Sequence, residues 1–455
     1  MSSLTVRKAI APAYLFLCLL LGGSAQGAWG NALLQILAVL IIGWSFLDDQ
    51  RATLPRAARP LIAIMGAGVV IAALQLIPLS PALWTRLPGR EMIVGGRELL
   101  GLAPGWSSIS LAPYATFTTA FFLLPSLALF LAVLRWGKGT ESWLAIALLG
   151  ATFVGVLLGL PQVLGGMVRT NPWHLYEQSN FGFATGFFAN KNHMASLLLA
   201  AVPFLIAFGS LTARSTKDER KRYSVVALTA GGLGVLMAAI WLNRSSAAFA
   251  LICPVLAASL VMGGWVPARW KSMVLGVGIA LFLGILVAIS SPAGQRFAPA
   301  SSAESLANRK EILSTSYEAI RKFGPVGTGL GTFEQVYPLF EDPEEVGLTY
   351  VNHAHNDYVE LTIELGVAGA ILALLFLAWW VASVRRMLAA PNASLFAKGA
   401  AIASAAILIH SAVDYPLRTA AMSSVFALCL ALILVSRTSA GSSKDLREAR
   451  HLVIE

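Results

Sequence analysis

Apolar stretches long enough to cross a bilayer recur from one end of the chain to the other. A membrane-spanning α-helix needs about 17–25 predominantly apolar residues. About twelve stretches of roughly this length are found, at 9–26, 30–47, 61–78, 115–134, 143–165, 193–212, 224–242, 246–265, 272–290, 358–384, 396–413 and 420–436. The pattern predicts an all-α, polytopic membrane protein.

Composition supports this class of protein. Hydrophobic residues make up 57% of the 455-residue chain and charged residues 12%. Water-soluble domains average about 25% charged residues, so the chain lacks the polar surface of a water-soluble globule. The three cysteines, Cys18, Cys253 and Cys429, all lie in predicted spans, which argues against a zinc pattern and against a disulfide framework.

Charged residues between the spans predict the orientation of the chain. Lys and Arg gather in alternate connecting segments, most clearly at 213–224, and basic residues stay on the cytoplasmic side because they resist translocation. Both termini are therefore predicted inside. The net charge of +10 follows from this topology, so no nucleic-acid partner is expected. The first span resembles a signal peptide, because Arg7 and Lys8 precede it, but we keep it as a span.

Polar residues on the predicted outer side are concentrated in three segments, 79–114, 166–192 and 291–357. A membrane protein with elaborated outer loops is expected to act on a substrate outside the cytoplasm. The predicted organisation is helices one to nine within 1–290, a large outer loop with short helices at 291–357, helices ten to twelve within 358–437, and a cytoplasmic tail at 438–455.

The third outer segment contains three recognisable stretches. Helical spacing of apolar residues predicts a helix at 303–323, ended by Gly324 and Pro325. The glycine-rich run 324–333 lacks the spacing of a nucleotide-binding loop and is interpreted as a tight turn. The acidic run 341–345 could hold a cation, but it is interpreted as a solvated loop.

The most polar stretch beside a span is "NHAHNDYVELTIELGVAG", 352–369. The helix expected from Asn356 onward would be about 42 Å long, against a hydrocarbon core of about 30 Å. Its first two turns are therefore expected among the outer headgroups. His355 lies at the helix N-terminus, where free amides and the helix dipole favour an anion such as phosphate. Glu360 and Glu364 share a face with Asn356, although the glutamates could equally serve only to solvate the helix end.

His355 and Asn356 also begin a longer pattern. They are followed by nine residues and then by the tetrapeptide GVAG at 366–369. This resembles, in full, the outer-loop signature of the O-antigen ligase and O-antigen polymerase superfamily of bacterial membrane glycosyltransferases: His, then Asn, Ser or Gln, nine free positions, and Gly-x-x-[Gly/Thr/Tyr]. Arg309 with Leu313 four positions later resembles a second signature of the family.

Three further segments resemble the same family in its order along the chain. "GFFANKNHMASLL" (186–198) resembles the Asn-rich start of a middle span, and Arg244 in "NRSSAAF" falls where the family has an essential arginine. "HSAVDYPLR" (410–418) resembles the family's closing segment. One difference is that Asn243 precedes Arg244, where the family often has Ser.

The resemblance implies transfer of a glycan from undecaprenyl diphosphate to an acceptor hydroxyl, at the periplasmic face of the bacterial inner membrane. Arg309 and Arg244 are the candidate diphosphate ligands, with Lys191 as an accessory, because a guanidinium can hold two phosphate oxygens at once. His355 is the candidate general base. This predicts a single inverting displacement that needs no metal and no cofactor.

Five further side chains are candidates for substrate contact. His410 and Asp414 lie four residues apart near the outer end of a span, where ionisable residues are costly and often functional. They could equally form a structural hydrogen-bonded pair. Asn356 and, more weakly, Asn192 and His353 complete the set. Each arginine could instead form a structural ion pair.

The identity of the acceptor remains open at this point. A ligase would transfer the glycan to lipid A core, and we favour it because the histidine signature matches in full. The alternative is an O-antigen or exopolysaccharide polymerase, which would use a second carrier-linked glycan. A polysaccharide flippase or transporter is disfavoured, because no internal repeat is visible and the ionisable residues gather at the outer rim.

Overall fold

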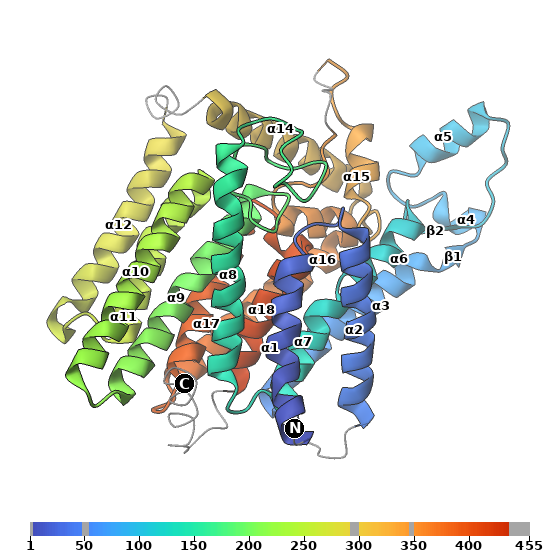
Figure 1. Cartoon of the computed structure of the whole chain (residues 1–455). Coiled ribbons are helices and arrows are strands. Elements are labelled where there is room, and N and C mark those ends of the chain that lie inside the picture. The colour runs from blue at the N-terminus through green and yellow to red at the C-terminus, as the bar shows by residue number, and fades with distance from the viewer. Residues whose placement is uncertain (1–2, 48–53, 292–299, 345–349, 436–455) are drawn as a thin grey trace.

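The structure, a computed structural model, describes residues 3–47, 54–291, 300–344 and 350–435. Long helices run side by side as a bundle, and α14 lies across one end of it (Figure 1). The helices at the predicted spans are α1 (Ser3–Leu21), α2 (Ala28–Leu47), α3 (Arg59–Leu76), α6 (Pro113–Phe121), α7 (Leu124–Trp136), α8 (Glu141–Leu164), α9 (Lys191–Ser215), α10 (Glu219–Asn243), α11 (Ser246–Gly263), α12 (Lys271–Ser290), α16 (Asp357–Leu388), α17 (Leu395–His410) and α18 (Ala420–Val435).

The shorter elements connect these helices. They are η1 (Arg56–Ala58), β1 (Pro78–Leu79), α4 (Pro81–Trp84), α5 (Glu91–Leu99), β2 (Ser107–Ser108), η2 (Ala268–Trp270), α14 (Ala300–Phe323), α15 (Phe333–Val336), η3 (Tyr337–Leu339) and η4 (Pro416–Arg418). The two strands form a single antiparallel pair, with Pro78 opposite Ser108. The helical class predicted from the sequence is confirmed.

Nine helical segments in the described part of the chain are long and apolar enough to cross a membrane, and α17 and α18 are apolar but shorter. The chain is therefore a multi-pass membrane protein. The total of twelve spans, their sidedness and the division into outer and inner segments stay predictions. The predicted cytoplasmic tail, 438–455, lies outside the described residues.

Two of the predicted spans are not continuous helices. The span at 115–134 consists of α6 and α7, and Pro125 occupies the start of α7, where its missing N–H costs no hydrogen bond. The helix predicted to run unbroken through 358–384 is interrupted inside α16 at Gly366, whose φ is 63° and ψ −149°. The prediction of one straight helix of about 42 Å is therefore wrong.

The centre of the bundle is α9. It packs against α8, α10, α11 and α17, and nearly all of its residues from Asn192 to Ser210 are buried. By contrast, α12 packs mainly against α11 and exposes Val277, Ile279 and Leu281. A helix with exposed apolar side chains on this scale is expected to face lipid. The polar residues of α9 therefore lie where lipid does not reach.

A second hydrophobic cluster lies at the α14 end of the bundle. Its buried members come from α14, α15, η3, the loop before α16 and the start of α16: Ile312, Ala319, Phe323, Phe333, Val336, Tyr337, Ala354, Val359 and Ile363. The helix predicted at 303–323 is confirmed by α14. This cluster fixes α14 and the start of α16 against each other.

The segment from β1 to β2 forms an arm that projects to the side of the bundle, with α5 farthest out (Figure 1). Arg90 in this arm is buried, donates to the carbonyl of Ile109 and lies with its guanidinium 5.7 Å from the ring centroid of Phe323. Glu91 and Lys322 form an ion pair. These contacts attach the arm to the end of α14.

Candidate active site

Asp414 is the meeting point of the predicted site residues. Its side chain is fully buried, in the turn between α17 and η4. Arg309 Nη2 lies 3.2 Å from Asp414 Oδ2, to which Asn192 also donates through its side-chain amide. His355 Nδ1 and His193 Nε2 lie 3.6 and 3.9 Å from Oδ1. Side chains from α9, α14 and the loop before α16 thus converge on one carboxylate.

The charge of Asp414 is maintained by these neighbours. Burial alone would raise the pKa of the carboxyl group, but contacts with His355, Arg309 and His193 hold the pKa well below its usual range. The backbone amide of Tyr415 also donates to Oδ1, at 2.8 Å. Asp414 is therefore a fixed negative charge around which the cationic side chains are arranged.

Two of the predicted site residues have unusual backbone conformations. His355 has a φ of 48° and Arg244 a φ of 55°, and they are the non-glycine residues with positive φ among those the structure describes. This left-handed region is uncommon for residues other than glycine, and such conformations concentrate at functional sites. Both residues are among the candidates that the family resemblance pointed to, His355 through a signature and Arg244 through its position.

The position of His355 follows from the cap of α16. Asn356 is the N-cap, and its Oδ1 accepts from the amides of Tyr358 and Val359 at 3.0 and 3.1 Å. Its Nδ2 donates to the carbonyl of Ala412 at 2.8 Å, which ties the start of α16 to the turn that carries Asp414. The side chain of Asn356 is thus engaged in holding this junction. The substrate contact predicted for it stays a prediction.

Two further cationic side chains, Lys191 and Arg244, lie next to Asp414 and its neighbours. Lys191 Nζ lies 3.8 Å from the ring centroid of Phe183 and 3.5 Å from the carbonyl oxygen of Arg244. Arg309 and Arg244 both act on Lys191 electrostatically. Buried Asn243 donates to the carbonyls of Ala184 and Lys191, so the residue that differs from the family pattern fixes the turn that presents Arg244.

His410 has a different partner from the one considered from the sequence. Its Nδ1 lies 2.7 Å from Ser196 Oγ of α9, and its contact with Asp414 is the backbone bond from the Asp414 amide to the His410 carbonyl at 2.9 Å. The imidazole is 1% exposed. A direct substrate contact of His410 stays a prediction, and its burial favours a role in holding the turn.

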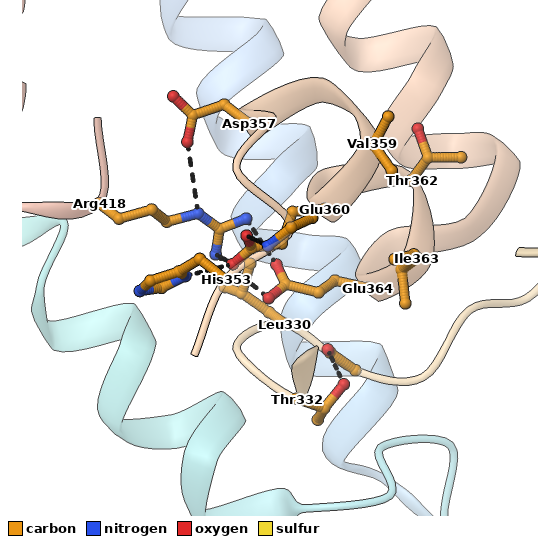
Figure 2. A network of polar contacts seen from close by, with 12 residues as sticks. Leu330, Thr332, His353, Asp357, Val359, Glu360, Thr362, Ile363, Glu364 and Arg418 are labelled. Carbon is orange, nitrogen blue, oxygen red and sulfur yellow. Dashed lines mark hydrogen bonds and ion pairs between the residues drawn. The ribbon is translucent and has the colours of Figure 1, made fainter. Parts of the chain in front are cut away.

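A second polar network surrounds Arg418 (Figure 2). Two guanidinium nitrogens of Arg418 donate to the two oxygens of Glu364 at 3.1 and 3.0 Å. Glu360 lies 3.5 Å and Asp357 3.7 Å away. Burial opposes the charge of Arg418, but Glu360, Glu364 and Asp357 together raise its pKa above the ordinary value. The glutamates therefore do not merely solvate the helix end.

The glycine of the family signature lies at a chain crossing. The amide of Val367 donates to the carbonyl of Pro325 at 2.9 Å, and the Glu364 carbonyl accepts from Gly329 at 2.9 Å. A Cβ at Gly366 would overlap the carbonyl oxygen of Pro325. Only glycine fits this φ and this approach. The glycine-rich run 324–333 is thus the turn that packs into the break in α16.

All eight of the predicted catalytic and substrate-binding residues lie at or near the buried carboxylate of Asp414. His193, Ser196 and Tyr415 were missed by sequence reasoning, as was the network of Arg418. Their one sequence signal is that they belong to the two segments 186–198 and 410–418 that resemble the family. Within the described ranges, no group of three or more His, Cys, Asp and Glu side chains could hold a metal ion.

Comparison with known proteins bears on the central part of the chain. The family described as O-Antigen ligase matches residues 231–374, a range that contains Arg244, Arg309, His355 and Gly366. No curated protein matches the chain. The O-Antigen ligase match over residues 231–374, in a chain with a multi-pass helical bundle, supports the resemblance to the O-antigen ligase and polymerase superfamily drawn from the signatures.

Proposed function

We propose that the chain is an O-antigen ligase-like glycosyltransferase. It transfers a glycan from undecaprenyl diphosphate to a hydroxyl of lipid A core, at the periplasmic face of the inner membrane. The observation that carries this proposal is the convergence of Arg309, His355 and Asn192 on the buried carboxylate of Asp414. Arg309 and His355 lie within the matched family range.

His355 is the base that takes the proton of the acceptor hydroxyl. Its Nδ1 is buried and faces Asp414, while the side chain as a whole is 24% exposed, so the Nε2 edge is the accessible part. A carboxylate behind an imidazole orients the ring and stabilises the imidazolium that forms on proton transfer. This is the arrangement that a general base requires.

Arg309, Arg244 and Lys191 bind the diphosphate. Asp414 anchors Arg309, whose side chain remains 23% exposed, so the guanidinium is fixed in position and still accessible. Negative charge grows on the diphosphate as its bond to the anomeric carbon breaks. Fixed cations at this position stabilise the transition state more than the ground state.

The reaction is a single displacement. The acceptor oxygen forms a bond to the anomeric carbon as the bond from that carbon to the phosphate oxygen breaks. Undecaprenyl diphosphate leaves with the electron pair, and the hydroxyl proton passes to His355. The anomeric configuration is inverted, and these residues perform the step without a metal ion.

The acceptor is identified by the products that a deletion strain accumulates. For a ligase, deletion leaves polymerised glycan on undecaprenyl diphosphate and lipid A core without glycan, and the wild-type gene restores the transfer. For the polymerase alternative, deletion leaves single repeat units on the carrier and on lipid A core. Mass spectrometry of both lipid pools separates the two outcomes, and unchanged pools would contradict both.

A further inference from the structure

A second imidazole lies beside the proposed base. His353 is two residues before His355, and both rings pack against Tyr415, with centroid distances of 4.0 Å for His353 and 5.0 Å for His355. His353 Nδ1 lies 2.7 Å from Glu360 Oε1, and the contact is visible in Figure 2. Both histidines thus contact one tyrosine, and each has its own carboxylate, Glu360 for His353 and Asp414 for His355.

The carboxylate of Glu360 is fixed at both oxygens. Oε2 accepts from the backbone amide of Ala354 at 2.9 Å, and Oε1 is 3.5 Å from Arg418 Nη1. An ionised carboxylate can only accept hydrogen bonds, so the hydrogen between His353 and Glu360 belongs to Nδ1. In the neutral state of an imidazole with its hydrogen on Nδ1, Nε2 is a hydrogen-bond acceptor.

Arg418 holds this arrangement in place. Its bidentate contact with Glu364 fixes the guanidinium at a helix turn that also accepts hydrogen bonds from Gln75 and Gly329 through the Glu364 carbonyl. The order Glu364, Arg418, Glu360, His353 forms a continuous path of contacts (Figure 2). Burying the charged groups of Glu364, Arg418 and Glu360 is weak support for stability by itself. The network holds the imidazole of His353 in a single orientation.

We propose that His353 is a binding residue for the sugar acceptor. Its Nε2 accepts a hydrogen bond from a hydroxyl next to the one that His355 deprotonates, and Glu360 and Arg418 are positioning residues that act through it. The inference rests on the proposed function and adds the acceptor subsite to it. His353 is 26% exposed, so a sugar hydroxyl can reach the ring.

Charge separates this subsite from the diphosphate site. The cations Arg309 and Lys191 gather around Asp414, the carboxylate nearest to His355. Three carboxylates gather around Arg418, and one of them, Glu360, contacts His353. A diphosphate is repelled by carboxylates, whereas an uncharged sugar hydroxyl finds an acceptor there. The cations thus favour the donor diphosphate, and the imidazole beside the carboxylates favours the acceptor hydroxyl.

The test compares two variants with an amide side chain at position 353, His353→Asn and His353→Gln. The amide of His353→Asn lies near the place of Nδ1, so it keeps the contact with Glu360 and loses the Nε2 contact. The amide of His353→Gln reaches toward the place of Nε2. Purified variants in liposomes are assayed with undecaprenyl diphosphate-linked glycan and rough lipopolysaccharide, each varied in turn. His174→Asn is the control, because His174 is half-buried in another loop and bonds to Ser179.

For His353→Asn we expect an acceptor KM raised about three- to tenfold, the scale of one hydrogen bond, with the donor KM unchanged. His353→Gln should recover most of this loss. Glu360→Gln should raise the acceptor KM to a similar degree, and adding it to His353→Asn should have little further effect, because the two residues act as one unit.

Three results would overturn the proposal. They are an unchanged acceptor KM in a well-folded His353→Asn protein, a raised donor KM in its place, or a change in thermal stability alone. Transfer by the wild-type protein tests the proposed function separately. If the wild-type protein transfers no glycan from this donor, the proposed function fails, whereas wild-type transfer with an unaffected His353→Asn variant removes the acceptor subsite alone.

Discussion

Two ionic clusters lie at the start of α16, and they are built in opposite ways. Around Asp414, one carboxylate is surrounded by Arg309, His355 and His193. Around Arg418, one guanidinium is surrounded by three carboxylates. In the first cluster the central carboxylate is buried, and Arg309 and His355 remain partly exposed while His193 is buried. In the second, the three carboxylates are sealed in the protein.

Because of this difference, we expect the Asp414 cluster to act on the substrate and the Arg418 cluster to support the fold. Partly exposed cations held by a buried anion are available to an anionic substrate while they stay in place. Buried carboxylates around Arg418 cannot reach a substrate, and they act by fixing the helix start that carries His353 and His355. Removing the centre of each cluster should therefore have different consequences.

The largest effect is expected for Arg418→Met. It leaves Asp357, Glu360 and Glu364 without their guanidinium, and breaking a buried ion pair from one side costs about 3–5 kcal/mol. We expect a sharp fall in the yield of monodisperse protein and in its melting temperature in detergent.

Arg309→Met is the matched control for that change. Asp414 then keeps Asn192, His355 and His193, so this protein should accumulate normally while losing transfer. Equal stability of the two variants would show that the two clusters do not differ as described.

A smaller effect is expected when the charge of Arg309 is kept and its shape is changed. Arg309→Lys retains a cation but loses the planar fork that can hold two oxygens. Turnover should fall about 10- to 100-fold, the scale of a hydrogen bond to a charged group, with less change in donor KM. The assay is transfer from purified lipid-linked glycan, with expression matched. The neighbouring exposed Lys310 provides the control variant, Lys310→Ala, and substantial activity of Arg309→Lys would leave Arg244 as the principal diphosphate ligand.

The smallest effect concerns pH. The pKa of Asp414 is below its unfolded value of about 3.9. Its stabilising contribution is therefore fully present above about pH 5 and is lost as the pH falls below about 3.9 toward the folded-state value. The melting-temperature difference between wild type and Asp414→Asn should stay constant from pH 8 to 5 and shrink only below about pH 4. A difference that shrinks between pH 7 and 5 would mean that Asp414 takes up a proton near neutrality.

Much of the helical architecture could be predicted from the sequence. Apolar runs indicate helices because each span must satisfy its own backbone hydrogen bonds in lipid. Hydrophobicity cannot report a break such as Gly366, because "LGVAG" (365–369) remains apolar through the kink. What stops the helix there is the backbone of Pro325, some forty positions away along the chain, and no local pattern contains that contact.

The site could be predicted only in part, because local sequence patterns do not contain contacts between distant positions. Signatures identified His355 and Arg309 as separate residues, the position in a resembling segment suggested Arg244, and the closing segment suggested Asp414. The contacts between them join positions far apart: Asn192 and Asp414 are 222 positions apart, and Arg309 and Asp414 are 105 apart. Sequence periodicity describes one element at a time. The roles of His193, Tyr415 and Arg418 exist only once those elements are packed together.

The central claim is that the residues around Asp414 perform glycan transfer, with His355 as the base. The most direct measurement is the rate of transfer by purified His355→Ala protein in liposomes, beside wild type at equal amounts and equal melting temperature. We predict a loss of about 100-fold or more, the scale of a positioned general base. Near-normal transfer by a well-folded His355→Ala protein would contradict the account and reduce His355 to a residue that shapes the start of α16.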